Sequence, residues 1–251
     1  MLLAIDVGNS NIKCALFAQN SEPIQRFKTP SKQPHSAQGL YEWLSTQADI
    51  SQITSAIFST VVPSLKRPVA DMLKQLNIPY LQLSHSLNIP ITVDGQPPKN
   101  LGTDLLSNAI AAHHLYPNHK VIISFGTALT FLALSQKGEI MGCSFLTGLG
   151  TSFRALVDDA ALLNDIEIEE PESVNGLTTQ AALQSGFIFG YQGAVKEIAT
   201  RMAHSFDGKV TFITNGYEAN LVKPPLEGKI FDAHLTLRGL YFAACDNGLH
   251  S

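Results

Sequence analysis

Two glycine turns in this sequence carry residue types that bind phosphate groups and a metal ion. The first turn follows a short apolar run and has the sequence DVGNSNIK over residues 6–13. A glycine turn between strands exposes backbone N–H groups that can cradle phosphate oxygens. Asp6 offers the hard oxygen that Mg²⁺ prefers, and Asn9, Ser10 and Lys13 offer polar contacts to phosphates. Ordinary turn structure, which also favours aspartate before glycine, is the alternative interpretation of Asp6.

The second turn lies nearly half a chain further on. In the sequence SFGTALTF, Gly126 matches Gly8 at an offset of 118 residues, Thr127 matches Asn9, and a strand-like segment again follows. The backbone of Gly126, Thr127 and Ala128 is expected to bind phosphate as the first turn does. Two related turns facing each other across a cleft would make a two-sided phosphate site, so the pair predicts nucleotide binding.

Two further segments have residues of interest for catalysis and for nucleotide binding. Asp104 stands at the start of a predicted helix in NLGTDLLSNAIAAHH. It is either an N-cap, which typically stabilises a helix by about 1 kcal/mol, or a general base that takes a proton from an attacking hydroxyl. Thr214, Asn215 and Gly216 follow a predicted strand and either line an adenine or ribose pocket or form an ordinary strand-end turn. The sequence leaves both choices open.

The elements that must position these residues form a repeated pattern. Three strands are expected around each turn, over residues 2–5, 12–17 and 23–27 and again over 121–123, 129–134 and 139–145. Apolar spacing predicts helices over residues 40–47, 64–76, 104–116, 151–164, 178–204 and 235–245. Strands are also expected over 53–62 and 210–213, and a surface loop over 28–39. We interpret this as an ancient duplication with two domains, residues 1–117 and 118–251.

The composition and net charge exclude several classes of protein. The 251 residues are 45% apolar and 15% charged, which is typical of a globular chain and excludes intrinsic disorder. The net charge is −4 with no dense basic cluster, so no nucleic-acid partner is expected. No signal peptide and no membrane span are expected. Three well-separated cysteines argue against a disulfide framework and against a zinc site. The expected location is the cytoplasm.

Taken together, several motifs resemble the type III pantothenate kinases, including the Bvg accessory factor branch, in the superfamily of acetate and sugar kinases and actin-like ATPases. The resemblance spans essentially the whole chain. Besides the two turns it rests on STVVPS at Ser59, LGTDLLSNAIAA at Leu101, GCSFLTGL at Gly142, GLTTQAALQSG at Gly176 and ITNGYEA at Ile213.

This resemblance implies an α/β fold of duplicated actin-like (ribonuclease H-like) domains, each a mixed sheet with flanking helices. It implies a homodimer that transfers the γ-phosphoryl group of ATP to pantothenate, the first step of coenzyme A synthesis, with Mg²⁺ and a monovalent cation (K⁺ or NH₄⁺). The implied ATP and phosphate contacts are Asp6 (also the Mg²⁺ ligand), Val7, Gly8, Asn9, Ser10, Asn11, Ile12, Lys13, Gly126 and Thr127. The implied pantothenate contacts are Gly102, Thr103, Asp104 (as the base), Leu105 and Thr179.

The chain also departs from the pattern of this family. Ser124 stands at the monovalent-cation position, where the family has an aspartate, and Leu105 replaces the arginine of the GxDR motif. Gly95 aligns near a family tyrosine, and Thr147 replaces a proline. Two alternatives to a pantothenate kinase therefore remain: a non-catalytic relative that binds nucleotide or a partner protein as an accessory factor, and a kinase with a changed acceptor.

Overall fold

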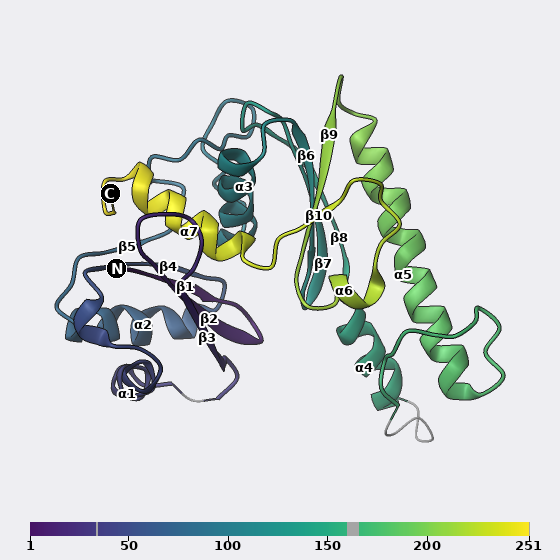
Figure 1. Ribbon diagram of the computed structural model, residues 1–251, viewed down its shortest axis with the longest axis horizontal. Coiled ribbons are helices and arrows are strands. Elements are labelled where there is room, and N and C mark those ends of the chain that lie inside the picture. The colour runs from purple at the N-terminus through teal and green to yellow at the C-terminus, as the bar shows by residue number, and fades with distance from the viewer. Residues whose placement is uncertain (34, 160–165, 251) are drawn as a thin grey trace. The chain divides into compact units, whose positions relative to one another are not determined.

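The computed structural model describes residues 1–33, 35–159 and 166–250 (Figure 1). The chain folds into two compact units. Unit 1 contains Met1–Leu115 and His234–Ser251, and unit 2 contains Tyr116–Ala233. The chain therefore passes from one unit to the other twice, after Leu115 and after Ala233.

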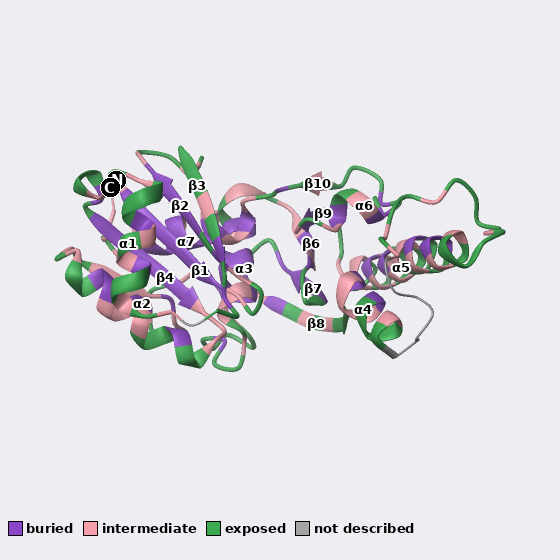
Figure 2. Ribbon diagram, turned by 90° about the horizontal axis from the view of Figure 1, so that it is seen from below, coloured by how far each residue is buried: buried purple, intermediate pink, exposed green. Residues whose placement is uncertain are grey.

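Unit 1 is built on a five-stranded mixed sheet in the order β3-β2-β1-β4-β5. Its strands are β1 (Leu2–Val7), β2 (Asn11–Phe17), β3 (Gln25–Pro30), β4 (Ser55–Thr60) and β5 (Tyr80–Gln82). The first three strands pair antiparallel, and β4 and β5 run parallel to β1. Every residue of β1 is buried, as the purple strands of Figure 2 show, because helices cover both faces of this sheet.

Opposite faces of the unit 1 sheet pack against different helices. Helices α1 (Ala37–Gln47) and α2 (Pro63–Gln75) cover the face to which alternate β1 residues such as Leu3 and Ile5 point. The other face holds α3 (Thr103–Leu115) and α7 (Leu235–Asp246), and Tyr241 of α7 packs against Phe17 with ring centroids 5.1 Å apart. Because side chains alternate along a strand, Asp6 points to this second face.

Unit 2 repeats the same sheet plan with the order β8-β7-β6-β9-β10. Its strands are β6 (His119–Phe125), β7 (Ala128–Leu134), β8 (Ile140–Thr147), β9 (Val210–Asn215) and β10 (Ile230–Phe231). Again the first three pair antiparallel and the last two run parallel to the first. The predicted duplication of the strand–turn–strand–turn–strand unit is thus confirmed by the topology.

Three helices pack on one face of the unit 2 sheet. They are α4 (Leu149–Asp159), α5 (Thr179–Ala203) and α6 (Ala219–Val222). Their core partners on the sheet are the alternate residues Val121, Ile123, Phe125, Leu129 and Phe131. The long helix α5 begins after Thr178, whose hydroxyl accepts a hydrogen bond from the backbone N–H of Ala181 and so caps the first turn.

The observed elements differ from the expected ones in a few places. Strand β3 extends to Pro30, into the expected loop over residues 28–39, because its whole length pairs with β2. The short elements η1 (Ile50–Gln52), α6 and β10 lack a periodic pattern long enough to predict them. The last part of the helix expected over 151–164 lies outside the described residues.

The C-terminal helix α7 is grouped by its contacts with unit 1, although the sequence halves 1–117 and 118–251 place it in the second. The reason is close packing on α3, where a Cβ at Gly239 would lie 1.8 Å from the carbonyl oxygen of Ser107. Ser107 Oγ also donates a hydrogen bond to the carbonyl of Thr236, at 2.7 Å. Only a glycine at 239 permits this approach of two backbones.

Candidate functional site

The first glycine turn joins β1 to β2 in unit 1. The backbone N–H of Gly8 donates to the carbonyl of Asn11 at 3.0 Å and closes the turn. Asn9, Ser10 and Lys13 are exposed, whereas the side chains of Val7 and Ile12 are buried. Any ligand contact from Val7 or Ile12 must therefore use backbone atoms.

Asp6 is the buried acid of this turn. Its side chain is 6% exposed, and its Oδ1 accepts a hydrogen bond of 3.0 Å from Ser59 Oγ on the neighbouring strand β4. Burial raises the pKa of Asp6, against the lowering effect of Lys13 and of the Ser59 hydrogen bond, and the carboxylate of Asp104 raises it further. A buried carboxylate beside a second acid is stabilised by a cation, so the surroundings of Asp6 fit a Mg²⁺ ligand.

Asp104 is the second residue of α3, so it lies in the first helical turn and is not the N-cap. A Cβ on Gly102 would lie 2.7 Å from Asp104 Oδ1, so this carboxylate stands close to the backbone of residue 102. Thr103 Oγ1 donates to the carbonyl of Thr60 at 3.2 Å and ties the helix start to the end of β4. Unit 1 thus brings Asp6 and Asp104 into electrostatic reach of each other.

Leu105, the residue at the family arginine position, is buried at 7% exposure. His113 and His114 lie at the other end of α3, where His114 Nε2 is 3.0 Å from Asp246 Oδ2 of α7. Across the described ranges, no group of three or more His, Cys, Asp or Glu side chains is arranged to hold a metal ion. Asp6 thus offers a single carboxylate, which suits Mg²⁺ because this ion keeps several waters and takes other oxygens from substrate phosphates.

The second glycine turn joins β6 to β7 in unit 2 in the same way. The backbone N–H of Gly126 donates to the carbonyl of Ala128 at 3.1 Å, and Gly126 and Thr127 are exposed. Ser124 pairs with Asn215 of β9 in the same register in which Asp6 pairs with Ser59 of β4. The acid–hydroxyl pair of the first turn is therefore a hydroxyl–amide pair in the second.

Two further glycines hold the second turn from either side. A Cβ at Gly148, just before α4, would lie 1.9 Å from the carbonyl oxygen of Gly126, and its N–H donates to the carbonyl of Thr127 at 3.0 Å. A Cβ at Gly216, which has a φ of +93°, would lie 2.0 Å from the carbonyl oxygen of Phe125. Sequence reasoning missed Gly148. Its position between a predicted strand and a predicted helix could have identified it, because close approach of two backbones needs glycine.

The end of β9 and the residues after it combine buried and exposed groups. Thr214 and Asn215 are buried, and Thr214 Oγ1 donates to the carbonyl of Ile230 at 3.3 Å. Tyr217 is 88% exposed. The aromatic ring of Tyr217 beside the backbone of Gly216 offers a surface on which a planar base can stack.

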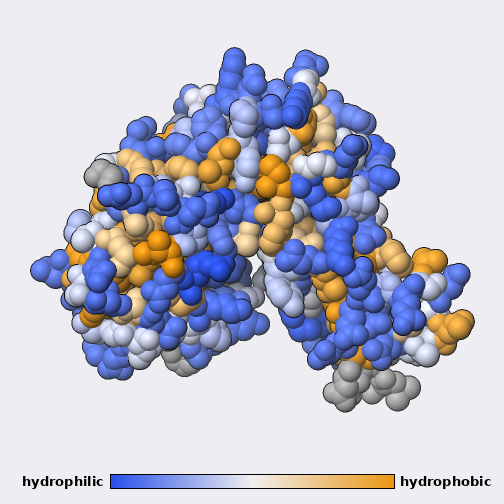
Figure 3. Space-filling model, viewed as in Figure 1, coloured by the Kyte–Doolittle hydropathy of each residue, from blue (hydrophilic) through white to orange (hydrophobic). Residues whose placement is uncertain are grey.

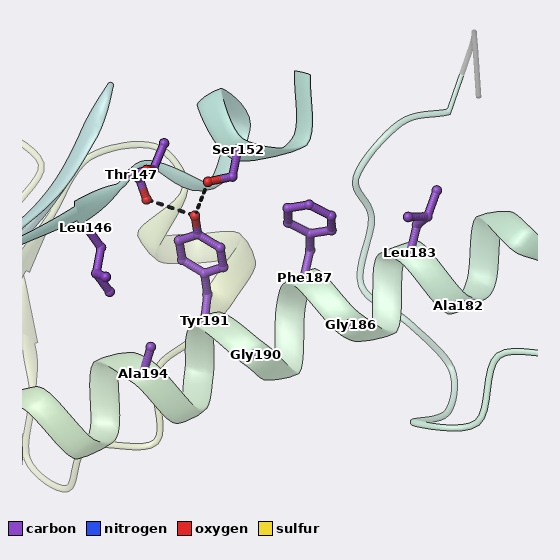
Figure 4. Close-up of a pocket in the computed structure, with 10 residues that line it drawn as sticks. All are labelled: Leu146, Thr147, Ser152, Ala182, Leu183, Gly186, Phe187, Gly190, Tyr191 and Ala194. Atoms are coloured by element: carbon purple, nitrogen blue, oxygen red, sulfur yellow. Dashed lines mark hydrogen bonds between the residues drawn. The ribbon is translucent and has the colours of Figure 1, made fainter. Parts of the chain in front are cut away.

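An apolar pocket of about 460 Å³ lies beside α5 in unit 2 (Figure 4). Small residues of α5 and Phe187 of the same helix line one side, and Leu146 of β8 also lines the pocket. Tyr191 Oη is the polar centre, 2.8 Å from the carbonyl of Thr147 and 2.7 Å from Ser152 Oγ. Sequence reasoning did not identify this pocket. Thr179 is exposed at the first position of α5, three residues before the lining residue Ala182.

The site residues are divided between the two units. The first turn, Gly102, Thr103 and Asp104 belong to unit 1, whereas Ser124, the second turn and Thr179 belong to unit 2.

Within the described residues, no helix is long and apolar enough to cross a membrane.

Comparison with solved structures defines the class of protein. The fold is similar to a Baf family transcriptional activator from Campylobacter jejuni, with a TM-score of 0.61 at 16% identity over 98% of both chains. It is also similar to a 2-dehydro-3-deoxygalactonokinase protein from Sinorhizobium meliloti, with a TM-score of 0.56 at 15% identity over 97% of this chain and 98% of the other. The chain thus has the duplicated α/β fold of the actin-like ATPases and sugar kinases.

Sequence comparison identifies the family within that class. Residues 2–201 match the family model described as type III pantothenate kinase. The type III pantothenate kinase of Moorella thermoacetica is 32% identical over 96% of this chain and 97% of its own length, and that of Dictyoglomus turgidum is 31% identical over 98% and 100%. The chain belongs to the type III pantothenate kinase family.

Proposed function

We propose that this chain transfers the γ-phosphoryl group of ATP to the primary hydroxyl of pantothenate. The observation that carries the proposal is the pair of acids in unit 1, where the buried Asp6 lies close enough to Asp104 for the two charges to interact. One acid beside a phosphate-binding turn and a second at a helix start are the minimum that phosphoryl transfer needs, namely a cation ligand and a base. We expect the reaction to take place in the cytoplasm.

The chain's residues have distinct roles in this proposal. Asp6 holds Mg²⁺, which when bound neutralises charge on the phosphate oxygens. The exposed Asn9, Ser10 and Lys13 and the backbone N–H groups of the first turn bind phosphate oxygens, and Gly126 and Thr127 of the second turn do the same. Asp104 Oδ accepts the proton of the pantothenate hydroxyl as that oxygen bonds to the γ-phosphorus and the bond from this phosphorus to ADP breaks. Gly102, Thr103 and Thr179 orient pantothenate.

A phosphoryl-transfer assay on the purified protein, with Mg-ATP and pantothenate, tests the reaction. We expect Asp104→Ala to lower kcat by about a thousandfold, the scale of losing a general base, while nucleotide affinity measured by calorimetry changes less than threefold. Glu42→Ala, which removes an exposed acid of α1, is the control and should leave both unchanged. Equal loss of catalysis and nucleotide binding in Asp104→Ala would instead make this residue a structural part of α3.

The substitutions at Ser124 and Leu105 favour one alternative, a kinase of the same fold with a different acceptor. Leu105 places a buried apolar side chain where the family has a cationic group for the acceptor carboxylate. ATP binding without phosphopantothenate formation, followed by turnover in a screen of other hydroxyl compounds, would support this alternative. ATP binding without turnover on any acceptor would support the accessory-factor interpretation.

We also propose that the chain works as a homodimer through the outer edge of the unit 2 sheet. Strand β8 is an edge strand, and its side chains Met141, Cys143 and Phe145 are exposed at alternate positions. Further large apolar side chains are exposed on α5 and on the segment before it, and Figure 3 shows apolar side chains at the surface of this part of the molecule. An exposed apolar edge is a pairing surface, and a second copy offers a matching one.

Sedimentation velocity tests the dimer. The wild type should sediment as a dimer at micromolar concentration, and Phe145→Glu should sediment as a monomer because it places a charge on the apolar edge. Glu139→Lys, which changes the charge just before the same strand, is the control. A wild-type monomer at all concentrations would rule out this interface.

A further inference from the structure

One carboxylate in unit 2 joins two segments that both contact the second glycine turn. Glu218 Oε1 accepts a hydrogen bond of 3.0 Å from the backbone N–H of Gly150, at the start of α4. Its other oxygen, Oε2, is buried and has no hydrogen-bond partner among the described residues. Glu218 is thus fixed by the first turn of α4 although it lies 68 residues further along the chain.

The two joined segments contact different residues of the turn. The segment around Gly150 contacts the turn through the N–H of Gly148 and the hydroxyl of Thr151, which both donate to the carbonyl of Thr127 at 3.0 Å. The segment around Glu218 contacts it through Gly216, which abuts the carbonyl of Phe125. The Glu218–Gly150 hydrogen bond therefore closes a ring of contacts around residues 125–127.

Opposing electrostatic effects act on the carboxyl group of Glu218. The amino-terminal N–H groups of α4 carry partial positive charge, and Arg154, one turn further along the helix, adds a full charge that lowers the pKa of Glu218. Burial acts in the opposite direction, and it is the larger effect, so the pKa of Glu218 is raised. The space is also closed to larger residues at 150, where a Cβ would lie 2.7 Å from Glu218 Oε1.

The first turn is held in a different way. A Cβ at Gly8 would meet only the carbonyl of Asn11, at 3.3 Å, and this residue belongs to the same turn. Distant segments contact the first turn through backbone hydrogen bonds, from the N–H of Ser31 to the carbonyl of Ser10 at 3.0 Å and from the N–H of Val61 to the carbonyl of Val7 at 3.1 Å. The second turn differs because close glycine contacts and the Glu218 side chain also hold it.

We propose that Glu218 is a positioning residue that fixes the second phosphate-binding turn through the start of α4. This inference rests on the proposed function, because it assigns the turn to ATP phosphates. In this proposal Glu218 acts through the turn and is assigned no contact with nucleotide or pantothenate. Its effect is to keep the exposed backbone of Gly126 and Thr127 in one conformation before ATP arrives, which lowers the entropic cost of binding.

The test compares Glu218→Ala with Glu218→Gln, whose amide oxygen still accepts from Gly150, and with Glu227→Ala as the control, since Glu227 is an exposed acid of the same unit. We expect Glu218→Ala to weaken the binding of a non-hydrolysable ATP analogue, measured by calorimetry, by about tenfold, the scale of one hydrogen bond to a charged group. Glu218→Gln should recover most of that affinity. The KM for pantothenate should stay within twofold of the wild type in all three variants.

A second measurement tests the local stability of the turn directly. Amide hydrogen exchange at residues 125–128 should be faster in Glu218→Ala than in Glu218→Gln or Glu227→Ala. Equal exchange and equal nucleotide affinity in Glu218→Ala and Glu227→Ala would overturn the inference while leaving the kinase intact. Absence of nucleotide binding by the wild type would overturn the proposed function, and the exchange rates would still decide whether Glu218 holds the turn. If Glu218→Ala does not fold, Thr151→Val, which removes another contact of the same ring, takes its place with the same expected direction.

Discussion

The two glycine turns have the same backbone plan and different chemistry. Each follows the central strand of a five-stranded sheet, and each is closed by a glycine N–H bonded to a carbonyl across the turn. Strand β1 carries a buried acid, Asp6, at the turn end, whereas β6 has the neutral Ser124 at the equivalent position. The buried charge of β6 is Lys120, at the opposite end of its strand, where β1 has Leu2. Duplication of a backbone therefore did not duplicate the charges.

This difference suggests a division of roles within the proposed site. The first turn offers a charge for a cation and is held by backbone hydrogen bonds within its hairpin and from Ser31 and Val61. The second turn offers only backbone and hydroxyl groups, and Gly148, Gly216 and Glu218 hold its shape. Substitutions that remove charge should therefore be most harmful in the first turn, and substitutions that disturb backbone packing most harmful around the second.

The largest expected effect comes from removing the charge of the first turn. Asp6→Asn should lower Mg-ATP-dependent turnover by about a thousandfold or more, because the first turn loses its buried carboxylate, the proposed cation ligand. The protein without nucleotide should become slightly more stable at pH 7. The pKa of Asp6 is raised on folding, so its contribution to stability is present below its ordinary pKa and is lost as pH rises through the folded value.

A coupled assay and urea unfolding measure the two effects of Asp6→Asn. Asp207→Asn, which changes an exposed acid, is the control and should alter neither. Undiminished turnover in Asp6→Asn would remove the metal role from the first turn and, with it, the contrast between the turns.

Backbone packing around the second turn is tested by a matched pair of glycine substitutions. Gly148→Ala should destabilise the protein by about 3 kcal/mol, because the new Cβ would overlap a backbone carbonyl. Gly8→Ala should lower the free energy of unfolding by less than about 1 kcal/mol, since the new Cβ would lie only slightly too close to the carbonyl oxygen of Asn11. Urea denaturation gives both values, and similar losses in the two variants would show that the turns are equally dependent on packing.

Lys120, the buried charge of β6, is expected to lower the free energy of unfolding without contributing to the proposed site. Lys120 is fully buried, its Nζ has no hydrogen-bond partner among the described residues, and burial lowers its pKa to about 8. Replacing it with the residue of the first repeat, Lys120→Leu, should stabilise the protein by about 2 kcal/mol at pH 7.

The pH dependence of the free energy of unfolding tests this interpretation of Lys120. Because the unfolded lysine keeps its proton to a higher pH than the folded one, wild-type stability should rise between about pH 8 and 10.5 from this group. The advantage of Lys120→Leu in urea unfolding should therefore shrink as the pH is raised from 7 to 9.5. A constant advantage at both values would mean that Lys120 keeps its proton in the folded protein as it does in the unfolded one, so that burial does not lower its pKa.

The smallest expected effect comes from giving the second turn the acid of the first. Ser124→Asp should make turnover depend on K⁺, with an increase of about threefold to tenfold in its presence, the scale of one added charge near the site. Assays with KCl and with tetramethylammonium chloride at equal ionic strength separate K⁺ binding from screening. Ser124→Asn is the neutral control, and an equal salt response in both variants would exclude a cation site at this position.

The amino-acid sequence by itself determined the local features of this protein. Glycine at 8 and 126, the apolar runs before them and the alternating strands after them are sufficient to predict two related turns, and helical spacing predicts α2, α3 and α5 to within a few residues. These features depend on contacts between near neighbours in the chain, so their residue types suffice. The motifs around Asp6, Asp104 and Gly126 also sufficed to indicate the family.

Only the tertiary structure decided which distant segments meet. That α7 packs on α3 in unit 1, that Gly148 and Gly216 abut the second turn, and that Glu218 reaches Gly150 are all consequences of close contact between segments far apart in sequence. A glycine that allows such contact looks in the sequence like any other turn residue, and a glutamate that fixes a helix start looks like a surface acid. Their roles depend on what packs against them, and this is set by the whole fold and not by any single stretch of chain.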